Sequence, residues 1–395
     1  MIKVTHIIAG LQADGAEMVL HTIASRMDAQ RFQNEVISLT DRGVMAERLE
    51  AAGVPVRTLG MRPGVPNPIR IAQLAGLIKA SKPSVVQTWM YHADLLGGLA
   101  ARLAGSPPVV WGIHHSNLEP GQNRRMTIMT ARACAKISGS IPTKIICCSE
   151  ASRVAHIDFG YNAEKMEVIP NGFDLKRFHQ DSEARNSLRR ELGVPNETML
   201  IGIAARFHVQ KGHRNFVEAA ARLHSAMPEV HFVLCGKGAE KSNPELMGWI
   251  KGAASDLASR FHLLGARNDV ARIFAALDIS TSASISEAFP MAVGEAMACG
   301  TPCVVTDVGD SALIVGETGR AVPPSNPERL SEAWKDLLTA SLATRRAMGR
   351  AARERIEHNF NIGTIVQRYQ TLYQRVTGTS DPVVVQESSV ASVAR

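Results

Sequence analysis

Short apolar runs alternate with helical hydrophobic patterns along most of the chain, and this alternation limits the possible folds more than any other feature. An apolar run over 4–9 precedes a helical pattern over 17–27, and a run over 36–39 precedes another over 44–52. A strand, a helix and a further strand in succession form a βαβ unit, which builds parallel sheets covered by helices on both faces. The sequence therefore predicts an α/β protein, with further strands at 85–88, 109–113, 144–148 and 165–169.

The same rhythm begins a second time in the later half of the chain. A polar segment over 171–190 follows Pro170, and an apolar run starts again at Met199. The 395 residues also exceed what one hydrophobic core usually organises. We therefore expect two Rossmann-like parallel-sheet domains, residues 1–170 and 171–357, then a C-terminal helix over 358–377 and a flexible tail over 378–395.

Several classes of protein are disfavoured by composition. The start of the chain carries Lys3 but no small-residue cleavage site, so we expect a first strand there and not a signal peptide. No segment approaches the roughly 20 apolar residues of a membrane-spanning helix. The six cysteines lie in apolar stretches without a CxxC pair or a histidine cluster, which favours reduced core thiols and no metal. These features predict a cytoplasmic protein.

The formal charge of +7 is modest and is not gathered into runs of Lys and Arg, so we expect no nucleic-acid partner. Residues 1–172 carry 18 Lys and Arg against 13 Asp and Glu. This excess favours peripheral attraction to an anionic membrane surface. The residues that suggest it most are Arg124, Arg125, Arg132 and Lys136 in a helical stretch, for which an ordinary solvated helix face is the alternative.

Two glutamates bracket a predicted helix N-terminus in the segment SEAFPMAVGEAMACGTP. Glu287 stands eight positions before Glu295, and Pro290 suits the first position of the helix. The backbone amides at such an end, from about Pro290 to Ala292, favour a bound phosphate. A carboxylate accepts hydrogen bonds from two neighbouring hydroxyls, so one glutamate suits a sugar diol and the other a ribose diol. The alternative is a solvated helix with two exposed acids.

Two cations follow a predicted strand in the segment RFHVQKG. Ligands collect at the carboxyl ends of parallel strands, so Arg206 and Lys211 should reach the same edge of the sheet. Both would stabilise a diphosphate leaving group, Arg through its planar fork and Lys as a mobile charge. Taken alone, the pair could equally be surface residues on a loop.

Two weaker signals lie in the first half. Gly10 and Gly15, in the turn after the first strand, allow close approach of the backbone to a ligand, but the turn is not GxGxxG and dinucleotide binding is disfavoured. His114 and His115 end another strand, where one of them would face a ligand; a structural role is the alternative.

Together these motifs resemble the family 4 retaining glycosyltransferases, which have the GT-B fold, and the resemblance spans nearly the whole chain. It includes IPNGFD from Ile169, HLLG from His262 and the closing YQTLY helix. The resemblance implies two Rossmann-like domains facing across a cleft, with the acceptor on the first, the donor on the second and the last helix crossing back. It also implies transfer with retained configuration and without a metal or other cofactor.

The resemblance assigns a role to each candidate residue. Glu287 would bind the transferred sugar and Glu295 the ribose, while Arg206 and Lys211 would bind the diphosphate. Gly15 would lie on the donor phosphate side, and Asp14 replaces a glycine common in the family. His114, chosen over His115 by its distance from Val109, would contact the donor sugar. The catalytic candidates are His114, Glu287, Arg206 and Lys211, and the donor-binding candidates add Gly15, Gly265, Ala266, Phe289, Pro290, Met291, Ala292 and Glu295.

The expected activity is hexosyl transfer from a nucleotide diphosphate sugar, with UDP favoured, to a saccharide or lipid-linked saccharide in surface polysaccharide or glycolipid synthesis. The residues do not by themselves exclude GDP or ADP, because backbone groups near Gly265 and Ala266 would hold the base. Alternatives are another GT-B sugar-nucleotide enzyme such as an epimerase or a phosphorylase, a non-catalytic subunit of polysaccharide assembly, and a nicotinamide-dependent oxidoreductase.

Overall fold

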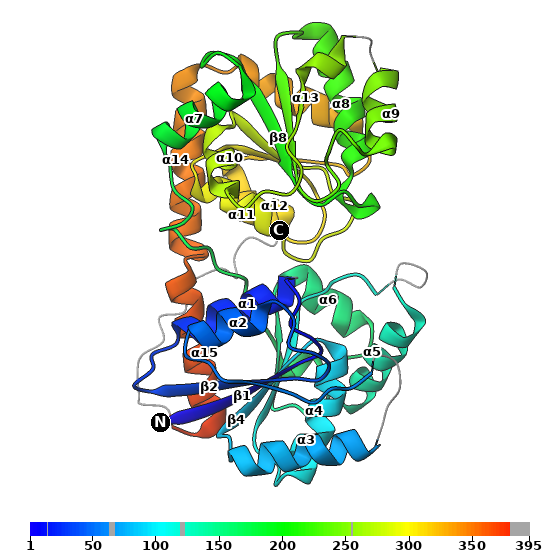
Figure 1. The fold of residues 1–395 in the computed structure, drawn as a ribbon, viewed down its shortest axis with the longest axis vertical. Coiled ribbons are helices and arrows are strands. Elements are labelled where there is room, and N and C mark those ends of the chain that lie inside the picture. Colours follow the sequence, from blue (N-terminus) through cyan, green and yellow to red (C-terminus); the bar gives the residue numbers. More distant parts are fainter. Residues whose placement is uncertain (14, 63–67, 119–122, 254–255, 380–395) are drawn as a thin grey trace. The chain divides into compact units, whose positions relative to one another are not determined.

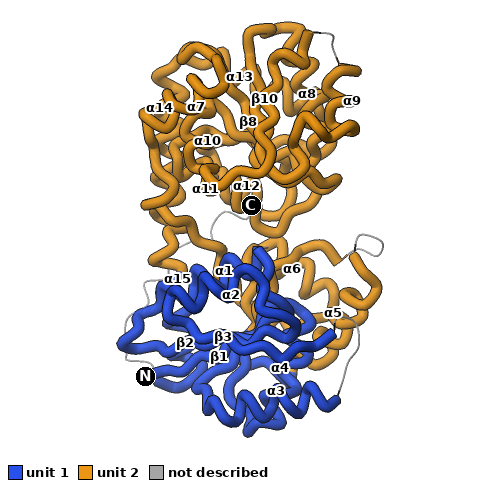
Figure 2. Tube along the Cα trace, viewed as in Figure 1, with its two compact units in different colours: residues 1–111, 140–144, 366–395 blue, residues 112–139, 145–365 orange. Residues whose placement is uncertain are grey.

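A computed structural model describes residues 1–13, 15–62, 68–118, 123–253 and 256–379. The position of Asp14 and the predicted tail from residue 380 onward lie outside this range. The chain forms two compact units (Figure 2). Of the described residues, the first unit holds those within 1–111, 140–144 and 366–379, and the second holds those within 112–139 and 145–365. The predicted boundary at residue 170 stays a prediction.

The first sheet has seven strands in the order β3-β2-β1-β4-β5-β6-β7. The registered pairs, such as β1 with β2 and with β4, are parallel. Nearly every residue of its central strands is buried, as expected for a sheet covered on both faces. The strands are β1 (Ile2–Ile8), β2 (Phe32–Ser38), β3 (Val56–Thr58), β4 (Val85–Trp89), β5 (Val109–Ile113), β6 (Lys144–Cys147) and β7 (Met166–Val168), and the helices between them are α1 (Gly15–Arg26), α2 (Met45–Ala51), α3 (Pro68–Ser81), α4 (Tyr91–Leu103), α5 (Arg125–Ile137) and α6 (Glu150–Asp158).

The second sheet has six strands in the order β10-β9-β8-β11-β12-β13, again with parallel pairing. These two sheets confirm the predicted α/β class. The strands are β8 (Leu200–Ala204), β9 (His231–Cys235), β10 (Phe261–Leu263), β11 (Ile279–Ser282), β12 (Cys303–Thr306) and β13 (Arg320–Val322), and the α-helices are α7 (Ser182–Leu192), α8 (His213–Ala226), α9 (Pro244–Ala253), α10 (Val270–Ala276), α11 (Met291–Ala298), α12 (Ser311–Val315), α13 (Pro327–Thr339) and α14 (Leu342–Asn359).

Alternate residues of the second sheet enter two separate cores. In β9, Phe232 and Leu234 pack into one core, whereas Val233 and Cys235 pack into the other. This two-residue period is the geometry of a strand with both faces buried. Figure 1 shows α8, α9 and α13 on one side of β8 and α7, α10 and α14 on the other. The carboxyl ends of the strands are therefore left for the loops that carry the candidate site.

The last helix, α15 (Ile362–Thr377), contributes its residues from 366 onward to the first unit. Tyr369 stacks on Trp89 of β4 with ring centroids 6.3 Å apart. The Tyr373 hydroxyl donates a hydrogen bond of 3.1 Å to Gln87, also of β4. Ile365, Tyr369 and Leu372 follow one another at spacings of four and three on one face of α15 and are buried, whereas Val376 on the same face is half-buried.

Among the described residues, no helix is both long enough and apolar enough to cross a bilayer. All six cysteines are buried, and they are thiols that form no disulfide bond. Within the described ranges, no three His, Cys, Asp or Glu side chains gather in a way that could hold a metal ion.

Candidate active site

The short helix α11 begins at Met291, one residue later than predicted, with Pro290 as its N-cap residue. Pro290 has no backbone N–H, so the amides available at this end begin with Met291. Gly294 lies where an added Cβ would meet the Phe173 ring at 2.0 Å, and this ring fixes the helix against the core. Phe289 also packs there, with its ring 6.0 Å from that of Phe173, so only its backbone is left for a ligand.

Glu287 lies in the loop before α11, and its carboxylate is held by two partners. It forms an ion pair with Lys211 and accepts a hydrogen bond of 2.8 Å from the Ser284 hydroxyl. The Glu287 side chain is 12% exposed and that of Lys211 is 26% exposed. Because breaking such a partly buried pair leaves a charge without compensation, each side chain needs either the other or a charged ligand.

The loop that carries Lys211 is held against the end of β11. Gly212 has φ 64°, and a Cβ there would lie 1.9 Å from the Ala283 carbonyl oxygen. Only glycine adopts this conformation at such close range without strain. The Ile285 amide donates to the Gln210 carbonyl at 2.9 Å, which joins the two loops a second time. Lys211 and Glu287 are therefore brought together by backbone contacts as well as by charge.

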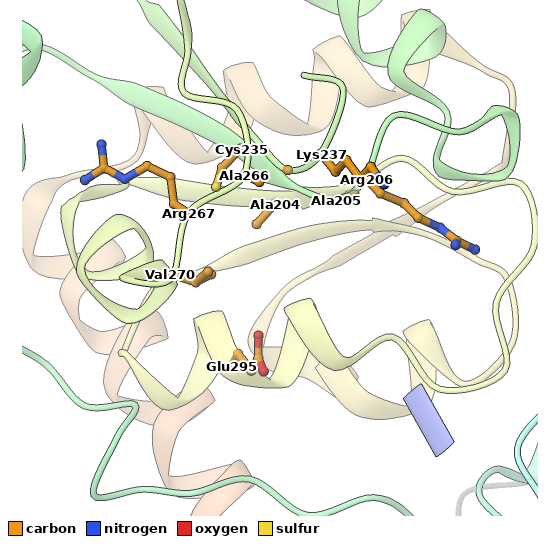
Figure 3. A pocket seen from close by; sticks show the side chains of 10 residues that line it. Ala204, Ala205, Arg206, Cys235, Lys237, Ala266, Arg267, Val270 and Glu295 are labelled. Atoms are coloured by element: carbon orange, nitrogen blue, oxygen red, sulfur yellow. The ribbon is translucent and has the colours of Figure 1, made fainter. Parts of the chain in front are cut away.

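A pocket of about 260 Å³ lies over the ends of β8, β9 and β10 (Figure 3). Glu295 projects into it from α11, and Arg206 and Arg267 extend to opposite sides. Burial raises the pKa of Glu295 to about 7, against the opposing effect of the charge on Arg177. The pocket is lined by Ala204, Ala205, Arg206, Cys235, Gly236, Lys237, Ala266, Arg267, Val270 and Glu295.

The structure brings the four charged residues singled out in the sequence together two by two, as one ion pair and as two residues that line one pocket. Glu287 contacts Lys211, and Arg206 lines the same pocket as Glu295. Each pair combines a residue from the loop after β8 with one from the segment around the start of α11. Glu287 and Lys211 are not part of the pocket lining.

Two cations of the pocket were not predicted, Lys237 and Arg267. Lys237 is exposed, whereas Arg267 pairs with Asp269 and with Glu191, each at 2.6 Å. The hydrogen bonds that Arg267 donates to these two carboxylates raise its pKa. Both cations lie in loops that follow strands, Lys237 after β9 and Arg267 after β10. The rule that ligands collect at strand ends was therefore the signal that could have identified them.

The backbone of Gly265 is already engaged within the protein. Its N–H donates to Ala239 at 3.0 Å, and its carbonyl accepts a hydrogen bond of 2.8 Å from Gly236. Ala266, the other residue predicted near the base, lines the pocket.

Gly15 begins α1 in the first unit, and a Cβ at that position would have no neighbour within 4 Å.

The two adjacent histidines have different surroundings. The His115 ring is 3.0 Å from the Asn123 side-chain oxygen, a hydrogen bond within its own loop. His114 is half-buried, and desolvation lowers its pKa to about 4. A neutral His114 ring at pH 7 follows, which suits a polar contact with an uncharged group better than with an anion.

Family models match both halves of the chain. The glycosyltransferase family 4 model covers residues 13–177, and the glycosyl transferases group 1 model covers residues 198–340. Among curated relatives, the UDP-Gal:alpha-D-GlcNAc-diphosphoundecaprenol alpha-1,3-galactosyltransferase of Escherichia coli is 28% identical over 77% of this chain and 78% of its own length. The N,N'-diacetylbacillosaminyl-diphospho-undecaprenol alpha-1,3-N-acetylgalactosaminyltransferase of Campylobacter jejuni is 25% identical over 87% of this chain and 92% of its own.

Solved structures agree on the fold. Anabaena HepE in complex with UDP aligns with a TM-score of 0.84 over 95% of this chain and 100% of its own, at 24% identity. The sucrose-phosphate synthase of Thermosynechococcus elongatus aligns with a TM-score of 0.76 over 96% of this chain and all of its own, at 20% identity. With two parallel-sheet domains and matching models on both halves, the chain belongs to the family 4 glycosyltransferases of the GT-B fold.

Proposed function

We propose that this glycosyltransferase moves a hexosyl group from a UDP-sugar to a lipid-linked saccharide, with retention of configuration and without a metal ion. The observation that carries the proposal is the Glu287–Lys211 ion pair, formed by the same two segments that supply Arg206 and Glu295 to the pocket lining. The relatives from Escherichia coli and Campylobacter jejuni, whose names specify diphosphoundecaprenol-linked substrates, support the acceptor class.

In the proposed complex each charged residue has one task. Glu295 accepts hydrogen bonds from the ribose hydroxyls, and Ala266 lies against the base. Arg206 and Lys211 neutralise the diphosphate, so Lys211 exchanges its ion pair with Glu287 for an ion pair with the approaching phosphate. Glu287 is then free to accept hydrogen bonds from hydroxyls of the transferred sugar, and His114 donates to or accepts from that sugar as a neutral ring.

The reaction breaks the bond between the anomeric carbon and the β-phosphate oxygen and forms a bond from that carbon to the acceptor oxygen on the same face. The acceptor proton passes to the departing phosphate oxygen. Negative charge grows on the diphosphate as the bond breaks, and preorganised cations stabilise it most in the transition state. Arg206 and Lys211 supply that positive field in the proposal, which is why no metal is required.

The Glu287→Gln variant tests the assignment. Loss of the carboxylate should reduce transfer from a UDP-sugar to a polyprenyl-diphosphate saccharide by about 10² to 10³, the usual effect of removing one such polar contact. Glu218→Gln is a matched control, because Glu218 pairs with Arg214 on an exposed helix surface. Full activity of Glu287→Gln would refute the proposed site, and NMR of the product anomer tests retention separately. Undiminished transfer after treatment with EDTA is the expected result for metal independence.

Peripheral binding to an anionic membrane is the second part of the proposal, and its support is the exposed face of α5. Arg125, Met129, Arg132 and Lys136 are exposed and follow one another at spacings of four, three and four, which places them in one row. No acidic residue occurs from Arg124 to Lys136. Basic residues near an anionic leaflet contribute about 1 kcal/mol each.

Vesicle flotation tests the membrane contact. Replacing Arg125, Arg132 and Lys136 by Gln should weaken binding to phosphatidylglycerol vesicles by about two orders of magnitude, from about 1 kcal/mol per cation. The same replacement of Lys335, Arg346 and Arg350, which are exposed on α13 and α14, removes equal charge elsewhere and should change binding much less. Equal recovery of wild type on neutral and anionic vesicles would eliminate this part of the proposal.

A further inference from the structure

The loop after β5 holds the segment that carries Glu287. The Ser116 hydroxyl donates a hydrogen bond of 2.6 Å to the backbone carbonyl of Glu287, and the Asn117 amide donates to the Ser286 hydroxyl at 3.3 Å. These residues are about 170 positions apart in the sequence and lie in the same compact unit. Two neighbouring side chains of the loop after β5 therefore form hydrogen bonds with two neighbouring residues of the loop before α11.

The loop after β5 is itself held in place by hydrogen bonds. The Asn123 amide donates to the Asn117 carbonyl at 2.8 Å, and its side-chain oxygen lies 3.0 Å from the His115 ring nitrogen. The Ser152 hydroxyl donates to the His115 carbonyl at 2.7 Å. Because two hydrogen bonds hold the backbone carbonyls of His115 and Asn117, the residues on either side of it, Ser116 donates its hydroxyl from a constrained position.

The backbone of residues 309–310 also contacts the segment that carries Glu287. A Cβ on Gly309, which has φ 57°, would lie 2.4 Å from the Glu287 carbonyl oxygen. The Asp310 amide donates to the Ala288 carbonyl at 3.1 Å. The Glu287 carbonyl oxygen thus lies close to both Gly309 and Ser116, while the Glu287 carboxylate pairs with Lys211.

We infer that Ser116 and Asn117 are positioning residues that set the location of the Glu287 carboxylate by holding its own backbone. The inference rests on the proposed role of Glu287 in binding the transferred sugar. Neither side chain needs to touch the substrate, because a shift of about 1 Å in a reacting group is enough to reduce a rate about 100-fold. Their effect should therefore depend on Glu287 being present.

A double-mutant cycle tests the inference. Ser116→Ala should reduce the single-turnover transfer rate about 5- to 20-fold and leave the affinity for UDP unchanged. Ser116→Thr, which keeps the hydroxyl, should return the rate to within about 2-fold of wild type. In a Glu287→Gln background, Ser116→Ala should change the rate by less than about 2-fold. Ser259→Ala is the control, because it removes a hydroxyl that donates to the Asp256 carbonyl at 2.7 Å elsewhere in the same unit.

The outcomes distinguish a failure of the positioning role of Ser116 from a failure of the proposed role of Glu287. Equal losses from Ser116→Ala with and without Glu287 would overturn the positioning role while leaving the function of Glu287 intact. A fully active Glu287→Gln variant would instead remove the proposed function. If Ser116→Ala does not fold, Asn117→Asp, which lacks the amide donor, replaces it in the same cycle with the same expected pattern.

Discussion

Buried polar side chains have different surroundings in the two units. In the first unit, His6 is fully buried, accepts a hydrogen bond of 3.3 Å from the Trp89 indole and donates one of 3.1 Å to Asn34. In the second unit, Glu295 projects into a pocket and Glu287 pairs with a cation on a loop. In the part of the chain that the structure describes, no hydrogen bond to the Glu295 carboxylate is found.

The difference teaches which polar groups stabilise the fold and which are available to a ligand. The partners of His6 come from neighbouring strands of one sheet, so its hydrogen bonds persist as long as the sheet does. In the proposed complex Lys211 exchanges its ion pair with Glu287 for one with the diphosphate, and burial raises the pKa of Glu295 to about 7. Substitutions in the two regions should therefore separate stability from activity.

The largest expected effect is on activity. Lys211→Met should lower the transfer rate by about 10³, as loss of one preorganised charge typically does. It should lower the free energy of unfolding by a smaller amount, about 1 to 3 kcal/mol, because the Glu287 carboxylate is only 12% exposed and loses its cation. Rates and urea unfolding curves of the same preparation give both values. If the loss in the free energy of unfolding equalled the loss in activation free energy, Lys211 would act mainly to stabilise the fold, as His6 does.

Acid should destabilise the protein through its buried histidines. Desolvation lowers the pKa of His6 to about 4, from an ordinary value of 6.5. Between these values the unfolded chain binds more protons than the native one, so the free energy of unfolding falls as the pH drops from 6.5 to 4. The loss for His6 alone is about 3 kcal/mol, since a tenfold change in a proton-binding constant corresponds to about 1.4 kcal/mol.

The check is urea denaturation of wild type and His6→Phe between pH 4 and 7.5. The variant should be less stable at pH 7.5 by about 2 to 3 kcal/mol, because the Trp89 and Asn34 groups lose their partner. Its stability should fall less steeply with acid than that of wild type. A parallel pH dependence in the two proteins would mean that His6 does not titrate as described.

The smallest effect concerns the affinity for UDP. The ribose hydroxyls favour the ionised form of Glu295, whose pKa is about 7, so UDP should bind more tightly as the pH rises through 7. Calorimetry between pH 6 and 8.5 should show an increase in affinity of about tenfold, which corresponds to about 1.4 kcal/mol of binding free energy. Glu295→Gln should reduce this increase. A pH dependence unchanged by that substitution would place its cause in the diphosphate instead.

The fold could be predicted wherever hydrophobic pattern alone determines an element. The strands predicted at 85–88, 109–113 and 144–148 agree with β4, β5 and β6 to within one residue. The helix α7 was missed because Leu188 is its one buried apolar residue, and its stability comes from an Asp181 cap and the buried Arg189. Arg189 donates to four backbone carbonyls and to Asp278, contacts that no local pattern reveals.

The candidate site shows the same limit. Glu287, Glu295, Arg206 and Lys211 stand in two short segments whose local pattern identified them. Lys237, Arg267 and Ser116 come from other loops, and their place beside the site depends on how the strands are ordered and how the loops pack. Their roles could not be predicted from spacing along the chain.

Calorimetric titration of UDP and of UDP-galactose into three proteins tests the central claim most directly. Wild type should bind both ligands, Glu295→Gln should weaken both by a similar factor, and Glu287→Gln should weaken UDP-galactose but not UDP. UDP-glucose and UDP-N-acetylglucosamine serve as alternative donors if galactose is not the sugar. Equal weakening of UDP and its sugar derivative by Glu287→Gln, or no weakening of either ligand by either substitution, would contradict the assignment of this helix end to the donor.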